Sequence, residues 1–284
     1  MSHLLDRPAA PVPRSATSAR SARSARGATV ARALVAEWTK ITGLRSTAWL
    51  AAATVVTAAA LAFGLGLFVR PGGAGSGASL AVAGHVLAQL GPLALGVLVG
   101  TGEYATGTFR ATFTAVPRRL PVLGGQTVVT AGWGAATAAA AVGASLLVTS
   151  GQRSGAGLVV DAADTETVRL LAGYVLHQTG VALLGLAIGA LLRRATGAFV
   201  TAIMLLLVLD QFLAANPGRL TDTLRALLPA AGARLVQGDA QITVLDAASL
   251  GPDLGAWGGG LVLLLWVVAL LGAAAYRLRR HDLS

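Results

Sequence analysis

Residues 254–276 read LGAWGGGLVLLLWVVALLGAAAY, and none of these side chains carries a charge. The inner part, Leu261–Leu271, is almost entirely aliphatic. A bilayer has a hydrocarbon core about 30 Å thick, which roughly 20 apolar residues cross as a helix. This stretch therefore predicts a membrane-spanning helix, and the same pattern recurs along the chain.

Six apolar stretches are separated by turns rich in glycine, proline or charge. The spans predicted from them cover residues 48–69, 79–100, 122–149, 170–192, 197–215 and 254–276. In a chain of 284 residues, six spans and their short loops leave no room for a separate soluble catalytic domain. We therefore expect an all-α membrane protein whose six transmembrane helices form one domain, residues 30–284.

The composition argues against a soluble protein. Charged residues make up 12% of the chain, about half the share of roughly 25% in soluble domains, and the mean hydropathy is +0.70. There is no cysteine, which excludes disulfides, thiolate metal sites and cysteine nucleophiles. The sequence also lacks a phosphate-binding loop, a His-Glu-x-x-His zinc motif and a Gly-x-Ser-x-Gly elbow, so we expect neither catalysis nor a bound cofactor or metal.

Basic residues predict the orientation. With the amino terminus in the cytoplasm, 16 of the 22 lysines and arginines lie on inner segments, and most acidic residues lie on outer ones. This predicts a multi-pass protein of the cell (plasma) membrane with both termini cytoplasmic. The net charge of +10 is then a topology signal, and no nucleic acid partner is expected.

Two segments precede the first span. Residues 1–29 form a low-complexity run of Ser, Ala, Arg and Pro, which predicts a disordered cytoplasmic tail and not a signal peptide. Residues 30–46 predict an amphipathic helix at the membrane surface, with Trp38 on its apolar side. Glu37 projects into the same stripe and can pair with Lys40.

The inner loop between the second and third spans reads TGEYATGTFRATFTAVPRR over residues 101–119. Gly107 breaks the chain there, and Thr108 can cap a short helix that presents Phe109 and Phe113 on one face. Such a helix can lie on lipid headgroups or insert into a groove on a partner protein. Its periodicity leaves both possibilities open.

Five short motifs resemble those of bacterial ABC export permeases of the type-2 class. Residues 36–40 (AEWTK), followed by 45–47 (RST), resemble the surface helix ahead of the first span in that family. Residues 102–104 (GEY) and 107–108 (GT) resemble its coupling segment, and 228–232 (LPAAG) its outer loop before the last span.

This resemblance implies a transport subunit that is not itself an enzyme. It implies ATP hydrolysis on a separate ABC ATPase subunit, with a second permease copy or a sister permease completing the transporter. Glu37, Trp38 and Lys40 would belong to the surface helix. The residues implied to couple the permease to the ATPase are Glu103, Gly107, Thr108, Phe109, Arg110 and Phe113. One departure is Gln126, near the place where the family often has a lysine.

Five polar residues in the spans are candidates for a translocation path: His85, Gln89, His177, Gln178 and Asp210. The alternative for each is an interhelical hydrogen bond, or an outer-interface carboxylate for Asp210. Two other functions stay open at this point. An intramembrane enzyme would use Glu103, His85 or His177, and a secondary transporter would show inverted repeats.

Two Gly-x-x-x-Gly pairs lie in the predicted spans, Gly96 with Gly100 and Gly185 with Gly189. Glycine at this spacing lets two helices approach closely. We expect these pairs to pack helices within the bundle and not between subunits.

Overall fold

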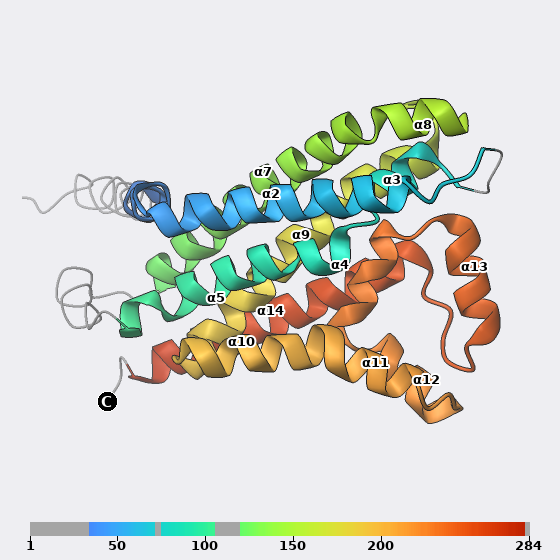
Figure 1. The fold of residues 1–284 in the computed structure, drawn as a ribbon. Helices are drawn as coiled ribbons and strands as arrows, with labels where there is room; N and C mark the ends of the chain where they lie inside the picture. Colours follow the sequence, from blue (N-terminus) through green and yellow to red (C-terminus); the bar gives the residue numbers. More distant parts are fainter. Residues whose placement is uncertain (1–33, 72–74, 106–119, 282–284) are drawn as a thin grey trace, which may run out of the picture.

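The computed structural model describes residues 34–71, 75–105 and 120–281, and this described part is helical with no strand (Figure 1). A helical segment covers residues 34–43. The helices that follow are α2 (Arg45–Gly66), α3 (Gly77–Val82), α4 (His85–Ala88), α5 (Leu90–Ala105), α7 (Leu120–Val148), α8 (Ser150–Ala156), α9 (Thr165–Leu192), α10 (Ala195–Ile203), the π-helix η1 (Met204–Val208), α11 (Leu209–Ala214), α12 (Arg219–Ala226), the 3-10 helix η2 (Pro229–Val236), α13 (Asp239–Ala248) and α14 (Gly255–His281). The predicted tail and residues 106–119 of the predicted coupling segment lie outside the described residues.

Five helices are long and apolar enough to cross a membrane: α2, α7, α9, the continuous run α10–η1–α11, and α14. A sixth crossing is available if the bent pair 77–88 and 90–102 counts as one span. By length and composition, the described residues therefore match an all-helical membrane protein.

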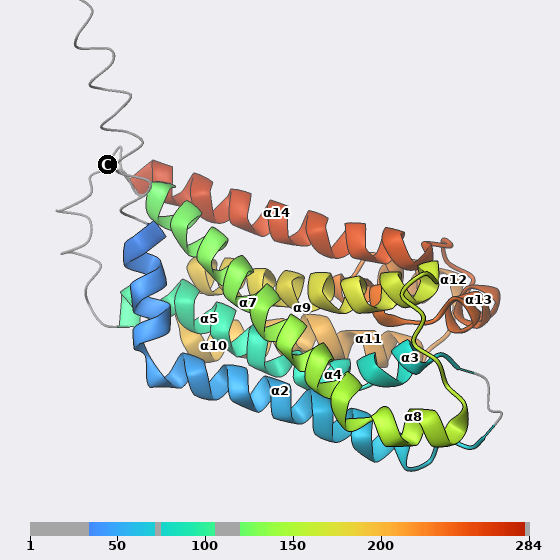
Figure 2. The same cartoon turned by 90° about the horizontal axis from the view of Figure 1, so that it is seen from above.

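Helix α9 forms the centre of the bundle, and the other long helices surround it (Figures 1 and 2). In the apolar 18-residue stretch of α9, 56% of the residues are buried inside the protein. In the corresponding stretches of the other four candidate spans, the buried share is 17–22%. The outer helices instead expose large apolar side chains, such as Trp49, Phe212 and Trp257. A surface of this kind suits hydrocarbon and would be costly in water.

Helices α5 and α9 pack closely along much of their length, and glycine makes this packing possible. A Cβ atom added at Gly96 would lie 1.9 Å from the Ala182 carbonyl oxygen, and one at Gly100 would lie 2.4 Å from that of Leu186. From α9 toward α5, a Cβ atom added at Gly185 would lie 2.6 Å from the Leu93 carbonyl oxygen. The prediction that these glycines pack helices within the bundle is confirmed.

The second predicted span is not one straight helix. It is divided into α3, α4 and α5, and its two halves bend by 43°. Pro92 lies in the first turn of α5. Backbone N–H groups in a first turn have no partner within the helix, so the missing N–H of proline costs no intrahelical hydrogen bond. Gly84 lies at the break before α4, and a Cβ there would be 2.8 Å from the Ala58 carbonyl oxygen of α2. Proline and close packing therefore favour a broken span here.

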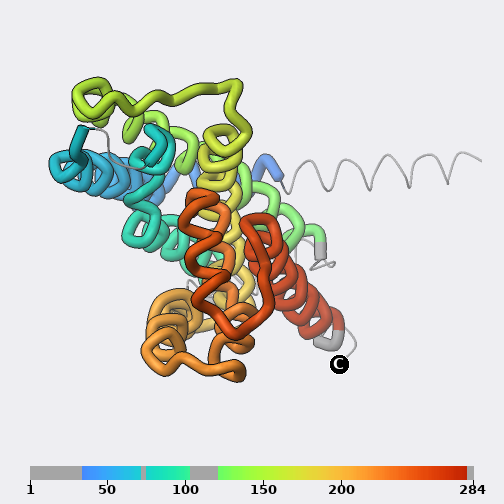
Figure 3. The backbone as a smooth tube through the Cα atoms, turned by 90° about the vertical axis from the view of Figure 1, so that its right-hand side faces the viewer, coloured from blue at the N-terminus to red at the C-terminus, as the bar shows by residue number. Residues whose placement is uncertain are grey.

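The two ends of the bundle differ. The segment 34–43 crosses one end, where α5 and α14 end and α7 begins; we call it the elbow end (Figure 2). At the opposite end, the cap end, α12, η2 and α13 fold over the bundle, and α8 lies at the same end on the side of α2 and α7 (Figure 3). The sequence predicted residues 216–253 only as an outer loop, so this helical cap is a departure from the prediction.

Candidate functional site

Four of the five predicted path residues meet at the bend of the second span. The Nε2 atom of His177 lies 3.3 Å from Oε1 of Gln89, and Nε2 of Gln178 lies 3.5 Å from the carbonyl oxygen of His85. The two histidine rings stand nearly perpendicular, with centroids 6.0 Å apart. These contacts join α4 and the start of α5 to the middle of α9, and we call the four residues the bend cluster.

The bend cluster satisfies backbone groups that the broken helix releases. Gln89 donates through Nε2 to the Val86 carbonyl oxygen at 2.9 Å, and Nδ1 of His85 lies 3.2 Å from that of Val82. Because a carbonyl oxygen only accepts, His85 must carry its proton on Nδ1 and His177 must carry one on Nε2. An unpaired backbone group would be costly in the apolar interior, so these bonds stabilise the bend.

Three buried polar atoms beside the bend cluster make no hydrogen bond of ordinary geometry among the described residues, although Tyr174 lies near Gln178 and His177 near the backbone of Gly232. They are the hydroxyl of Tyr174, Nδ1 of His177 and Oε1 of Gln178, all on neighbouring turns of α9. Each residue is at most 1% exposed. Together they offer hydrogen bonds to a water or to a polar group that enters the bundle.

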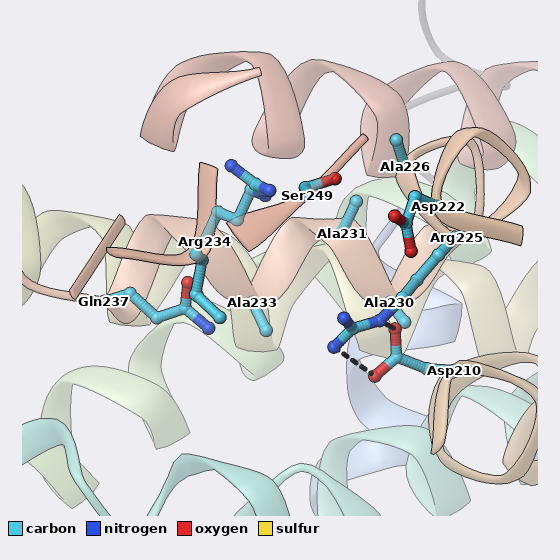
Figure 4. Close-up of a pocket in the computed structure, with 11 residues that line it drawn as sticks. Asp210, Asp222, Arg225, Ala226, Ala230, Ala231, Ala233, Arg234, Gln237 and Ser249 are labelled. Atoms are coloured by element: carbon cyan, nitrogen blue, oxygen red, sulfur yellow. Dashed lines mark hydrogen bonds and ion pairs between the residues drawn. The ribbon is translucent and has the colours of Figure 1, made fainter. Parts of the chain in front are cut away.

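Asp210 lies apart from the bend cluster, at the cap end. Its carboxylate accepts hydrogen bonds from Nε and Nη2 of Arg225, at 2.8 and 3.4 Å (Figure 4). With Asp222, Arg234 and Gln237 it lines a cavity of about 100 Å³. The structure therefore brings four of the candidate path residues together, and Asp210 is not among them.

Arginine–aspartate ion pairs hold the cap on the bundle. Arg169 of α9 bonds Asp239 at 2.7 Å and also donates to the Gln237 carbonyl oxygen at 3.0 Å. Arg234 pairs with Asp246, and both side chains are less than one-fifth exposed. In the sequence, these charges indicate only the topology, and the individual pairs could not be predicted from them. The one signal for them is the interleaving of arginine and aspartate over residues 219–246.

At the elbow end, the segment 34–43 is held by specific contacts. Glu37 is 5% exposed, and its Oε1 accepts from Nζ of Lys40 at 2.6 Å, which confirms the predicted pair. The ring of Trp38 meets that of Trp133 in α7 edge to face, with centroids 6.0 Å apart. The hydroxyl of Thr47 donates to backbone carbonyls of the turn that leads into α2. These contacts fix the angle between the segment and the bundle.

A groove of about 420 Å³ lies between the segment 34–43, α5 and α7, and we call it the elbow groove. Its apolar wall contains Ile41, Leu44 and residues 95–99 of α5, and its polar lining includes Glu37 and Gln126. In the sequence, Gln126 stands out only as a departure from the family pattern. No sequence signal showed that it shares a groove with Glu37.

The predicted coupling residues Gly107, Thr108, Phe109, Arg110 and Phe113 lie outside the described residues. Glu103 belongs to the last turn of α5, at the elbow end. It follows Leu90 by 13 positions, or about 20 Å along a helix axis. The backbone of Glu103 therefore lies far along α5 from the bend that holds the two histidines. The described residues also contain no group of three or more His, Cys, Asp or Glu that could hold a metal ion.

Comparisons of this chain with protein families, with curated proteins and with solved structures found no match.

Proposed function

We propose that this chain is the permease subunit of an ATP-driven ABC exporter in the plasma membrane. Six spans, with the bent pair counted as one, form half of the transporter. A second copy or a sister permease forms the other half. ATP is hydrolysed on a separate ABC ATPase subunit, which contacts the elbow end from the cytoplasm.

The observation that carries this proposal is the rigid elbow end. The Trp38–Trp133 contact joins the segment 34–43 to α7, and the Glu37–Lys40 pair lies within the segment. The same end holds the last turn of α5 and the first turn of α7, which flank the predicted coupling segment (Figure 2). A push on that segment would act directly on α5 and, across its glycine seam, on α9. Force from a partner therefore has a stiff route into the bundle.

The charges at the two ends support the proposed orientation. The elbow end carries basic residues with few acidic ones beside them, at Lys40, Arg45, Arg193, Arg194, Arg277 and Arg279. At the cap end, three arginines are bonded to aspartates. An excess of lysine and arginine marks the cytoplasmic side. We therefore place the elbow end in the cytoplasm, with the segment 34–43 at the membrane surface.

The bend cluster has a part in this proposal as a pivot. Its side chains bond backbone carbonyl groups at the bend, where the helix is interrupted. Because these groups keep partners, α5 can tilt relative to α4 at a low cost in hydrogen-bond energy. The three buried polar atoms of Tyr174, His177 and Gln178 lie at that pivot. A substrate path that opens beside α9 would bring these atoms into contact with polar groups of the cargo.

Co-purification tests the proposal. The tagged full-length chain is extracted from its native membrane in mild detergent, and co-purifying proteins are identified by mass spectrometry. We expect an ATPase with a phosphate-binding loop, and we expect its ATP hydrolysis to rise in the complex. The absence of any such subunit would contradict the exporter function.

A pair of variants separates the function from the coupling assignment. Phe109→Ala with Phe113→Ala is expected to abolish ATPase binding or stimulation. Phe212→Ala, on the exposed surface near the cap end, is the matched control and is expected to change neither. If the double variant behaves like the control, the coupling segment is wrongly assigned, even where an ATPase still co-purifies.

A further inference from the structure

The elbow groove combines an apolar wall with a polar end. Ile41 and Leu95 are almost fully buried at its base, while Leu44 and Leu98 are about half exposed at its sides. Its volume of about 420 Å³ lies in the range of roughly 300–1,000 Å³ that is usual for ligand sites. Such a groove can take an apolar chain along α5.

The polar end of the groove has unused hydrogen-bonding capacity. Gln126 is 7% exposed, lines the groove, and its side-chain amide has no hydrogen-bond partner among the described residues. Glu37 is equally buried and, in the described part of the chain, receives a bond only on Oε1, from Lys40. Its second oxygen and the Gln126 amide oxygen are therefore two acceptors without donors. Neither oxygen is among the fully buried partnerless atoms of the described residues, so a ligand or water in the groove can reach both and supply the donors.

The chemistry of these two acceptors selects the head group. A primary ammonium donates up to three hydrogen bonds from one positive charge. It could bond Glu37 and Gln126 together, and a bond to the carboxylate is charge-assisted. An alcohol would donate only one bond, and an ionised carboxylate head has no proton to donate to either acceptor. The half-exposed Lys40 at the rim keeps the empty site close to neutral.

We propose that the elbow groove binds an amphiphile with one apolar chain and a primary amine head, taken from the membrane leaflet at the elbow end. The chain lies along Leu95, Leu98 and Val99 of α5, and the amine bonds the carboxylate of Glu37 and the amide of Gln126. This proposal concerns binding alone and stands whether or not the chain is an exporter.

A second groove in the same protein provides an internal comparison. It lies between α9 and α14, has a volume of about 360 Å³, and contains Leu264. Its lining carries no charged side chain. An apolar chain without head-group selection would occupy both grooves alike, whereas selection for an amine requires Glu37.

The test uses the full-length protein in lipid nanodiscs and a photoreactive dodecylamine. We expect cross-links to map to residues 37–47 and 95–99. Unlabelled dodecylamine is expected to compete roughly tenfold more strongly than dodecanol, the factor expected for one hydrogen bond to a charged group. Dodecanoate is expected to compete least.

Three variants locate the site. Leu98→Trp, which fills the groove, is expected to abolish these cross-links, whereas Leu264→Trp in the other groove leaves them unchanged. Glu37→Gln and Gln126→Leu preserve the side-chain shape and are expected to remove most of the preference for the amine. Size-exclusion profiles check that each variant folds. The order in which the three amphiphiles compete is measured on the unmodified protein, so this part of the test does not depend on the folding of any variant.

Two results would overturn the proposal. If dodecanoate competes best, Lys40 binds the head group and an amine is not the ligand. If cross-links fall on both grooves alike, or survive Leu98→Trp, the elbow groove is not a specific site. Because the readout is binding, neither result depends on whether an ATPase is found.

Discussion

The seam between α5 and α9 makes a strong prediction for Gly96→Ala. The added methyl group would lie 1.9 Å from the Ala182 carbonyl oxygen and 2.8 Å from the Leu186 nitrogen. Both are backbone atoms of a helix, so no change of rotamer can relieve the contact. The two helices must separate.

The required separation sets the magnitude. Ordinary contact begins at 3.4 Å, so α5 must retreat by about 1.5 Å along this contact. A gap of even 0.5–1 Å removes roughly a quarter to a half of the dispersion energy of the atoms that face it. Overpacking typically costs about 1–3 kcal/mol, and Gly→Ala in a helix returns up to about 1 kcal/mol. Because Gly100 and Gly185 share the seam, we expect the cost to lie at the upper end of this range, which gives a net loss of about 2 kcal/mol.

Gly132→Ala in α7 is the matched control, because a Cβ atom there has no atom within 4 Å. It is expected to leave stability within about 1 kcal/mol of the original, or slightly above it. Both variants are unfolded in mixed micelles with increasing SDS, and tryptophan fluorescence reports the midpoint. Equal midpoints for the two variants would mean that α5 and α9 do not approach as closely as described.

Three further predictions concern the bend cluster, the cap and the orientation. Gln89→Leu is expected to cost about 1–3 kcal/mol in the same denaturation, because His177 Nε2 loses its only partner in the described structure, and adding His177→Phe should recover part of the loss. Arg234→Met is expected to leave Asp246 unpaired and to raise hydrogen exchange in residues 229–248, while the double variant with Asp246→Leu restores protection. Because the chain has no cysteine, Asp161→Cys and Thr196→Cys can each be labelled alone. An impermeant maleimide should label the first in intact cells and the second only after lysis, and the reverse pattern would invert the topology.

The positions of the spans could be predicted because hydrophobicity is a local sum over neighbouring residues. Four of the six predicted spans begin or end within a few residues of α2, α7, α10–α11 and α14. Two helix ends differ by five residues, because α14 continues to His281 and α9 begins at Thr165 and not at Leu170. Asp164 caps it by accepting from the backbone N–H groups of Thr167 and Glu166, and the Thr167 bond also holds the pKa of Asp164 below its ordinary value. The cap extends the helix beyond its apolar part.

The partners of the polar residues could not be predicted. Gln89 and His177 are 88 positions apart, and Arg169 and Asp239 are 70 positions apart. Nothing in a local pattern indicates which distant group a side chain meets. The same holds for Gln126, whose place beside the elbow depends on how α7 packs on the segment 34–43. Asp210 is an example. A carboxylate in a span predicted a residue of the translocation path, but its ion pair with Arg225 places Asp210 at the cap end.

The amino-acid sequence alone predicted an all-helical membrane protein and the positions of most helices. It also predicted that the glycine pairs allow close packing. Those properties follow from the apolar length of each segment and the size of single side chains. Only the tertiary structure decided that the second span bends, that an ion-paired cap covers one end, and that Glu37 and Gln126 share a groove. Each of these depends on contacts between segments far apart in the chain, and their energy exists only once the helices have packed.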